Sequence, residues 1–60
     1  MIEKEFYWLI DTHSGQRDYE PSEMTVTEAV ERNQYMERQN SRWRWLNKTE
    51  LAAFEEIGRN

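Results

Sequence analysis

An unbroken run of apolar residues, 6–10, dominates the start of the chain. Residues 3–11 read EKEFYWLID, a stretch rich in aromatic and branched side chains that favours an extended strand. One side carries Phe6, Trp8 and Ile10, and the other carries Tyr7 and Leu9. Because both sides are apolar, this predicted strand needs cover on both of its faces.

A turn and a second strand are predicted next. The polar segment 11–16 contains Gly15, which can take a positive φ without steric cost. Residues 16–20 can then return as a strand that forms a hairpin with the first. Pro21 has no amide donor and disfavours helical backbone before it, so the sheet is expected to stop there.

A helix is predicted to begin at Val26, because Thr25 and Glu28 have the spacing of a capping box. Its core-facing positions, spaced by three and four, are expected to be Val26, Ala29, Val30, Asn33 and Met36. Asn40 tolerates left-handed backbone, so the helix is expected to stop at Asn40 and Ser41.

A third strand and a short helix complete the pattern. In residues 42–46 a period of two places Trp43 and Trp45 on one face and Arg42, Arg44 and Leu46 on the other. Asn47, or alternatively Thr49, then caps a short helix. That helix is expected to present Leu51, Phe54 and Ile57 and to stop at Gly58.

These elements predict a single α+β domain over residues 1–60: a small three-stranded sheet in β-β-α-β order, one covering helix and a short C-terminal helix. If the third strand lies parallel to the first, a right-handed crossover leaves the first strand central. The expected core is Phe6, Trp8, Ile10, Val26, Val30, Met36, Trp45 and Leu46. The long helix covers one face only, so the other needs the terminal helix, a partner or a second copy.

Composition excludes several classes of protein. The 60 residues include no cysteine and one histidine, which excludes a disulfide framework and the usual closed zinc site. Charged residues make up 33% of the chain, but three tryptophans, three tyrosines and two phenylalanines in periodic segments indicate a folded domain. No apolar run is long enough to span a membrane and the first residues are acidic, so we expect a cytoplasmic protein.

The charges are unevenly distributed along the chain. The net charge is -4, with an acidic excess in residues 1–31, a basic excess in residues 32–48 and a smaller acidic excess thereafter. This asymmetry predicts separate acidic and basic surfaces, although ordinary solvation of a highly charged chain explains it equally simply.

Catalysis and metal binding find little support. His13 lies beside Asp11 and Ser14, but adjacent residues rarely form a catalytic triad and a turn does not exclude water. Asp11, His13, Asp18 and Glu20 match no metal-ligand spacing. We therefore expect no enzyme activity, no metal and no cofactor.

Two binding surfaces remain as candidates. Carboxylates on a rigid domain can imitate the phosphates of DNA on a basic protein, and tyrosines are frequent interface anchors. The predicted protein-binding residues are Tyr7, Asp11, Asp18, Tyr19, Glu20, Glu23, Glu28, Glu31 and Tyr35. The alternative is a nucleic-acid surface of arginines with stacking tryptophans, comprising Arg32, Arg38, Arg42, Arg44 and Lys48.

In size, charge and order of elements, this acidic chain resembles the small single-domain proteins that bacteriophages encode to inhibit host or defence machinery, such as anti-CRISPR proteins. The resemblance implies a non-enzymatic phage or mobile-element inhibitor that sterically blocks a nucleic-acid-handling protein. Two alternatives are a small nucleic-acid-binding protein that uses segment 42–48 and a homodimeric structural or assembly protein.

Overall fold

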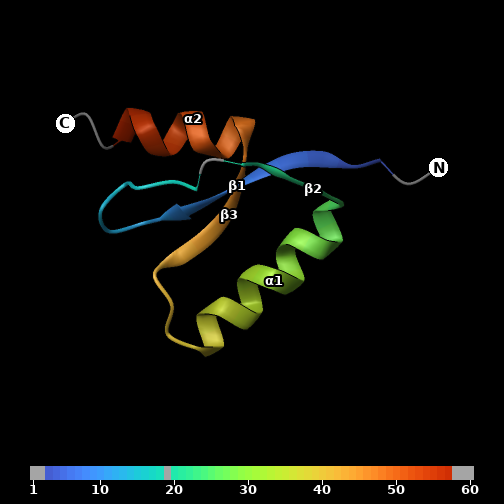
Figure 1. Cartoon of the computed structure of the whole chain (residues 1–60), viewed down its shortest axis with the longest axis horizontal. Helices are drawn as coiled ribbons and strands as arrows, with labels where there is room; N and C mark the ends of the chain where they lie inside the picture. Colours follow the sequence, from blue (N-terminus) through green and yellow to red (C-terminus); the bar gives the residue numbers. More distant parts are fainter. Residues whose placement is uncertain (1–2, 19, 58–60) are drawn as a thin grey trace.

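The computed structural model describes residues 3–18 and 20–57 and contains a three-stranded sheet with two helices (Figure 1). The elements are β1 (Glu5–Asp11), β2 (Ser22–Met24), α1 (Val26–Arg38), β3 (Trp43–Asn47) and α2 (Lys48–Ile57). The strand order is β2-β1-β3. The predicted α+β class, the order of elements and the central position of β1 are confirmed.

Both neighbours of β1 run antiparallel to it, so the parallel arrangement considered for the third strand is wrong. Tyr7 lies opposite Ser22 in β2, and Leu9 lies opposite Trp45 in β3. Since β2 and β3 both oppose β1, they run in the same direction as each other. The crossover through α1 therefore joins β2 to β3, and β1 fills the space between them.

The hairpin forms, but its second strand lies later in the chain than predicted. Among residues 16–18 and 20, the structure shows one isolated bridge, Ile10 with Arg17. β2 begins only after Pro21, so the expectation that the sheet stops at Pro21 is wrong. Proline is compatible with the residue that precedes an edge strand, because no ladder hydrogen bond is lost there. The turn itself is as predicted: Gly15 has a φ of 80° and its N–H donates to the Asp11 carbonyl.

Capping boxes begin both helices. In α1 the Thr25 hydroxyl accepts from the Glu28 N–H at 3.1 Å, and the Glu28 carboxylate accepts from the Thr25 N–H at 3.1 Å. In α2 Asn47 and Glu50 exchange the same pair of bonds at 2.8 and 3.2 Å. Asn47 is therefore the cap of α2, and the alternative cap Thr49 is wrong.

The end of α1 also follows the sequence. Asn40 has a φ of 56°, and its N–H donates to the Glu37 carbonyl while the Ser41 N–H donates to the Met36 carbonyl. These two bonds form a Schellman motif, which satisfies carbonyls that the last helical turn leaves open. The predicted stop of α2, Gly58, lies outside the described residues.

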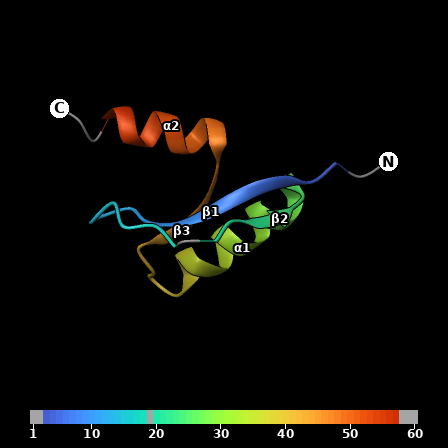
Figure 2. The same cartoon turned by 45° about the horizontal axis from the view of Figure 1, so that its top comes forward.

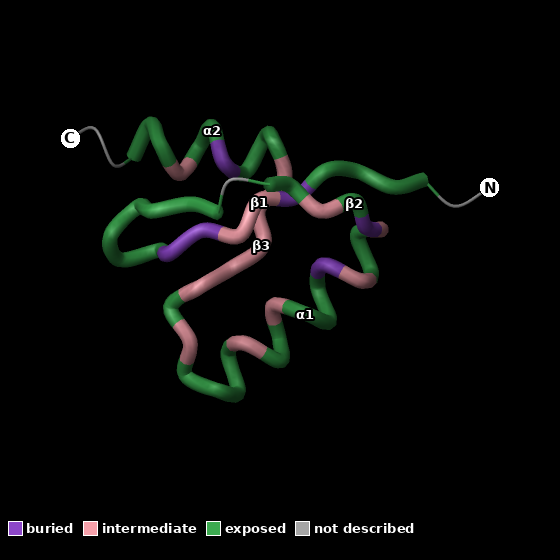
Figure 3. Tube along the Cα trace, viewed as in Figure 1, coloured by how far each residue is buried: buried purple, intermediate pink, exposed green. Residues whose placement is uncertain are grey.

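The two helices cover opposite faces of the sheet (Figure 2). Figure 3 shows buried segments in β1, at the start of α1 and in α2. Tyr7, Met24 and Ala29 form the cluster beneath α1, with Trp45 packed against it. Ile10 and Leu51 are also buried. The terminal helix is thus one of the covers that the apolar second face of β1 required.

The predicted core is only partly correct. Ile10 is fully buried, but Phe6, Val26 and Val30 are 54%, 59% and 49% exposed. The half-buried members of the predicted core are Trp8, Met36, Trp45 and Leu46. α1 places the small Ala29 against the sheet and so turns its two valines to the flank, while α2 leaves Phe6 uncovered.

No helix formed by the described residues combines the length and the apolar character needed to cross a membrane.

Truncating Ile10 tests the location of the core. Ile10→Ala is expected to lower the free energy of unfolding by about 2–5 kcal/mol, because the side chain is 1% exposed and its removal leaves a cavity. Urea denaturation followed by tryptophan fluorescence measures this. Val30→Ala is the matched control and should stay within about 0.5 kcal/mol of the wild type. Equal losses in the two variants would refute the burial pattern.

Removing the α1 cap tests the helix boundary. Thr25→Ala is expected to cost about 1 kcal/mol, because the Glu28 N–H loses its acceptor. Thermal denaturation by circular dichroism measures the loss, with the exposed Thr27→Ala as control. An unchanged melting temperature for Thr25→Ala would contradict the cap.

Candidate protein-binding site

The α1 face of the sheet contains an open groove of about 600 Å³, which we name the Trp43 groove. Its apolar lining consists of Leu9, Met36 and Trp43, all half-buried. Its polar lining consists of Gln16, Arg17, Asp18 and Ser41. The groove therefore combines an apolar interior with a polar rim, the usual composition of a site that holds part of another molecule.

The groove follows from the way α1 lies on the sheet. Tyr7, Leu9 and Asp11 share one face of β1, since neighbours two apart in a strand point the same way. The close contact of Ala29 covers the Tyr7 end of this face. Towards the other end, Met36 is the large apolar residue that α1 contributes to the groove. Leu9 and Trp43 are consequently left partly open.

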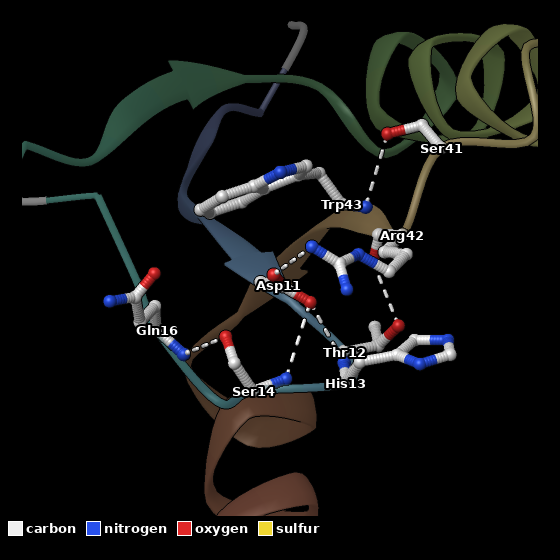
Figure 4. A network of polar contacts seen from close by, with 8 residues as sticks. All are labelled: Asp11, Thr12, His13, Ser14, Gln16, Ser41, Arg42 and Trp43. Carbon is white, nitrogen blue, oxygen red and sulfur yellow. Dashed lines mark hydrogen bonds and ion pairs between the residues drawn. The ribbon is translucent and has the colours of Figure 1, made fainter.

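The turn after β1 leads into residues 16–18, which line the groove, and Asp11 stabilises this turn (Figure 4). One carboxylate oxygen of Asp11 accepts from the backbone N–H groups of His13 at 2.9 Å and Ser14 at 3.3 Å. The other lies 3.4 Å from the Arg42 guanidinium. These contacts lower the pKa of the Asp11 carboxyl, and the hydrogen bond from the His13 N–H contributes most to the shift. The Thr12 hydroxyl also donates to the Arg42 carbonyl at 2.7 Å, joining the turn to the start of β3.

The same contacts bear on the triad considered for His13. The Asp11 carboxylate binds backbone amides, and the imidazole points away from it (Figure 4). The histidine side chain is thus not oriented by the acid as a general base requires. Within residues 3–18 and 20–57, no group of three or more histidine, aspartate or glutamate side chains is placed to hold a metal ion.

Three of the five predicted nucleic-acid-binding residues make intramolecular contacts. Arg42 pairs with Asp11, and the Arg44 guanidinium donates to the carbonyls of Ser41 at 2.6 Å and Trp43 at 2.7 Å. Arg32 lies over the ring of Trp45, 5.6 Å from its centroid. The other two, Arg38 and Lys48, are exposed at the end of α1 and the start of α2.

The predicted protein-binding set divides between structural and exposed residues. Tyr7 is 3% exposed, and burial raises the pKa of its hydroxyl. Asp11 is buried, and Glu28 is half-buried in the capping box, where the Thr25 N–H lowers the pKa of its carboxyl. Tyr7 and Asp11 are therefore buried, whereas Glu28 is partly accessible and serves the helix cap. Tyr19 lies outside the described residues.

The exposed members of the set occupy three places. Asp18 lines the Trp43 groove and Glu20 lies just beyond it in the chain. Glu23 is in β2 opposite Phe6, on the face of the sheet that carries α2. Glu31 and Tyr35 are one turn apart on α1. The structure thus divides the acidic residues among the groove, β2 and α1.

The three apolar groove residues were not among the predicted binding residues. The sequence held no usable signal for them, because its spacing predicts Val26 and Val30 on the same face of the helix as Ala29 and Met36. The structure leaves both valines exposed, and the remaining sheet-facing side chains of α1 do not fully cover Leu9 and Trp43.

Comparison with known proteins found no match to the chain among protein-family models, curated proteins or solved structures.

Acid titration tests the role of Asp11. Its folded pKa lies below the unfolded value, so its contribution to stability is complete above about pH 4 and is lost as the pH falls through the folded pKa. Asp11→Asn is expected to be less stable than the wild type at pH 7 and to lose less stability on acidification. Urea titrations from pH 7 to acid measure this, and parallel acid profiles would contradict the assignment.

Proposed function

We propose that the chain is a non-enzymatic protein-binding module whose Trp43 groove holds an apolar side chain of a basic partner protein. The groove is the observation that carries the proposal, because it leaves a tryptophan and a methionine partly open beside Leu9. Tryptophan is enriched among the residues that dominate binding energy, and methionine adapts to differently shaped ligands.

The charge distribution supports a basic partner. The net charge of -4 favours encounter with a positive surface. Within the groove, Arg17 lies beside Asp18 but pairs with Glu55 of α2 at 3.5 Å, and Glu20 follows these groove residues in the chain. Nucleic-acid-handling proteins present such positive surfaces. A module that occupies one would exclude nucleic acid by steric blockade, which is the action of the phage or mobile-element inhibitors that the sequence resembles.

The alternatives stay predictions with direct tests. The internal contacts of Arg32, Arg42 and Arg44 weigh against a nucleic-acid-binding function, which a mobility shift with short oligonucleotides at low salt examines. Light scattering across the micromolar range examines a homodimeric assembly function. The cytoplasmic location also stays a prediction.

Binding to a panel of purified basic nucleic-acid-binding proteins tests the proposal by calorimetry. For a panel member that binds, Met36→Ala is expected to weaken affinity about tenfold at every salt concentration, because apolar contact is lost in the groove. Glu20→Lys should weaken it several-fold at low salt and less at high salt, because exposed charges are screened.

Each variant has a matched control. Val30→Ala truncates another apolar side chain of α1 outside the groove, and Glu56→Lys reverses an exposed charge on α2. Both should bind like the wild type. Wild-type affinity of Met36→Ala, with its circular dichroism unchanged, would contradict the groove as the site. Absence of micromolar binding to every panel member would contradict a basic partner.

A further inference from the structure

The outer edge of β3 carries backbone groups that no strand satisfies. The Thr12 N–H donates to the Arg42 carbonyl at 3.0 Å. In an antiparallel pair every second residue directs its N–H and C=O to the partner strand, so this bond shows which residues of β3 face β1. Arg44 and Leu46 therefore direct their backbone groups to β1. The residues that direct theirs away from the sheet are Trp43, Trp45 and Asn47.

Side chains occupy these outward groups. The Asn33 carboxamide binds Trp45 twice: its oxygen accepts from the Trp45 N–H at 2.7 Å, and its nitrogen donates to the Trp45 carbonyl at 3.0 Å. Towards the ends of β3, the Trp43 N–H donates to the Ser41 hydroxyl at 3.2 Å and the Asn47 N–H donates to Glu50. The Trp43 carbonyl accepts from Arg44.

The Asn33 contact differs from the others because it joins two elements. The donors and acceptors at Trp43 and Asn47 come from residues at most three positions away, whereas Asn33 is twelve residues from Trp45 and reaches it from α1. Its two bonds are those that a neighbouring strand would make to Trp45. They also explain an asparagine between Ala29 and Met36 on the sheet-facing side of α1.

The other edge of the sheet offers less backbone for pairing. The Asp18 N–H donates to the Leu9 carbonyl, so alternate residues of β1 face β2, and in β2 only Glu23 faces outward. Pro21 has no N–H, and the Thr25 N–H is bound by Glu28. β3 is therefore the edge on which another strand could pair at length.

We propose that Asn33 is an edge-closing residue, whose carboxamide takes the place of a fourth strand at Trp45 and keeps β3 from pairing with β3 of a second copy. Unpaired edges are templates for association between sheets, and proteins block them with polar side chains. Without the carboxamide, two copies can pair antiparallel about Trp45. Trp43 of each copy then lies opposite Asn47 of the other, and the local contacts from Ser41, Arg44 and Glu50 are exchanged for hydrogen bonds between the strands. This inference is independent of the partner of the Trp43 groove.

Asn33→Leu tests the proposal, because leucine is close to asparagine in size and favours the helix but makes neither bond. Sedimentation equilibrium at pH 7 should show self-association about tenfold tighter than that of the wild type, with a new infrared band for intermolecular strands. Thr25→Ala is the control: it destabilises α1 without touching the edge and should associate like the wild type.

Three results would overturn the proposal. One is a folded Asn33→Leu variant that associates no more than the wild type. Another is equal association of Thr25→Ala, which would attribute the effect to general loss of stability. The third comes from the wild type alone, so it does not depend on whether Asn33→Leu folds. A Trp45 amide hydrogen that exchanges with solvent as fast as an exposed amide would show that the Asn33 carboxamide does not bind it. Exchange slowed at least about tenfold supports the proposal.

Discussion

β1 has strands on both sides and apolar residues on both faces, and the chain provides two helices, of 13 and 10 residues, to cover it. Each helix covers one part of its face. α1 is held close by Ala29 over Tyr7, and α2 contributes the buried Leu51 to the face that carries Ile10. The uncovered parts are the Trp43 groove and the surface around Phe6, and both result from covering a two-sided strand with so few residues.

Polar side chains hold much of this small structure together. Asp11 organises the turn and pairs with Arg42, Glu28 and Glu50 close capping boxes, and Asn33 joins α1 to β3. These residues satisfy backbone groups that a larger protein would bury in more regular structure. A charge map drawn from the sequence therefore overestimates the residues available to a partner, since several of its acids and arginines serve the fold.

The proposed closing of the β3 edge agrees with the proposed use of the Trp43 groove. Strand addition would use the β3 edge, where side chains already bind the outward groups of Trp43, Trp45 and Asn47. Side-chain contact in an apolar groove needs no free backbone. A partner recognised in this way is selected by the shape of the groove and by the charges near it.

The sequence by itself determined the features that depend on neighbouring residues. Thr25 with Glu28, Asn47 with Glu50 and the left-handed Asn40 act across at most three positions, and the alternation in 43–46 belongs to the strand itself. Only the tertiary structure decided the direction of β3, the position of β2, the exposure of Val26 and Val30 and the groove. Those outcomes depend on how closely α1 approaches the sheet and on contacts such as Leu9 with Trp45, between residues far apart in the chain, whose relative positions no local pattern contains.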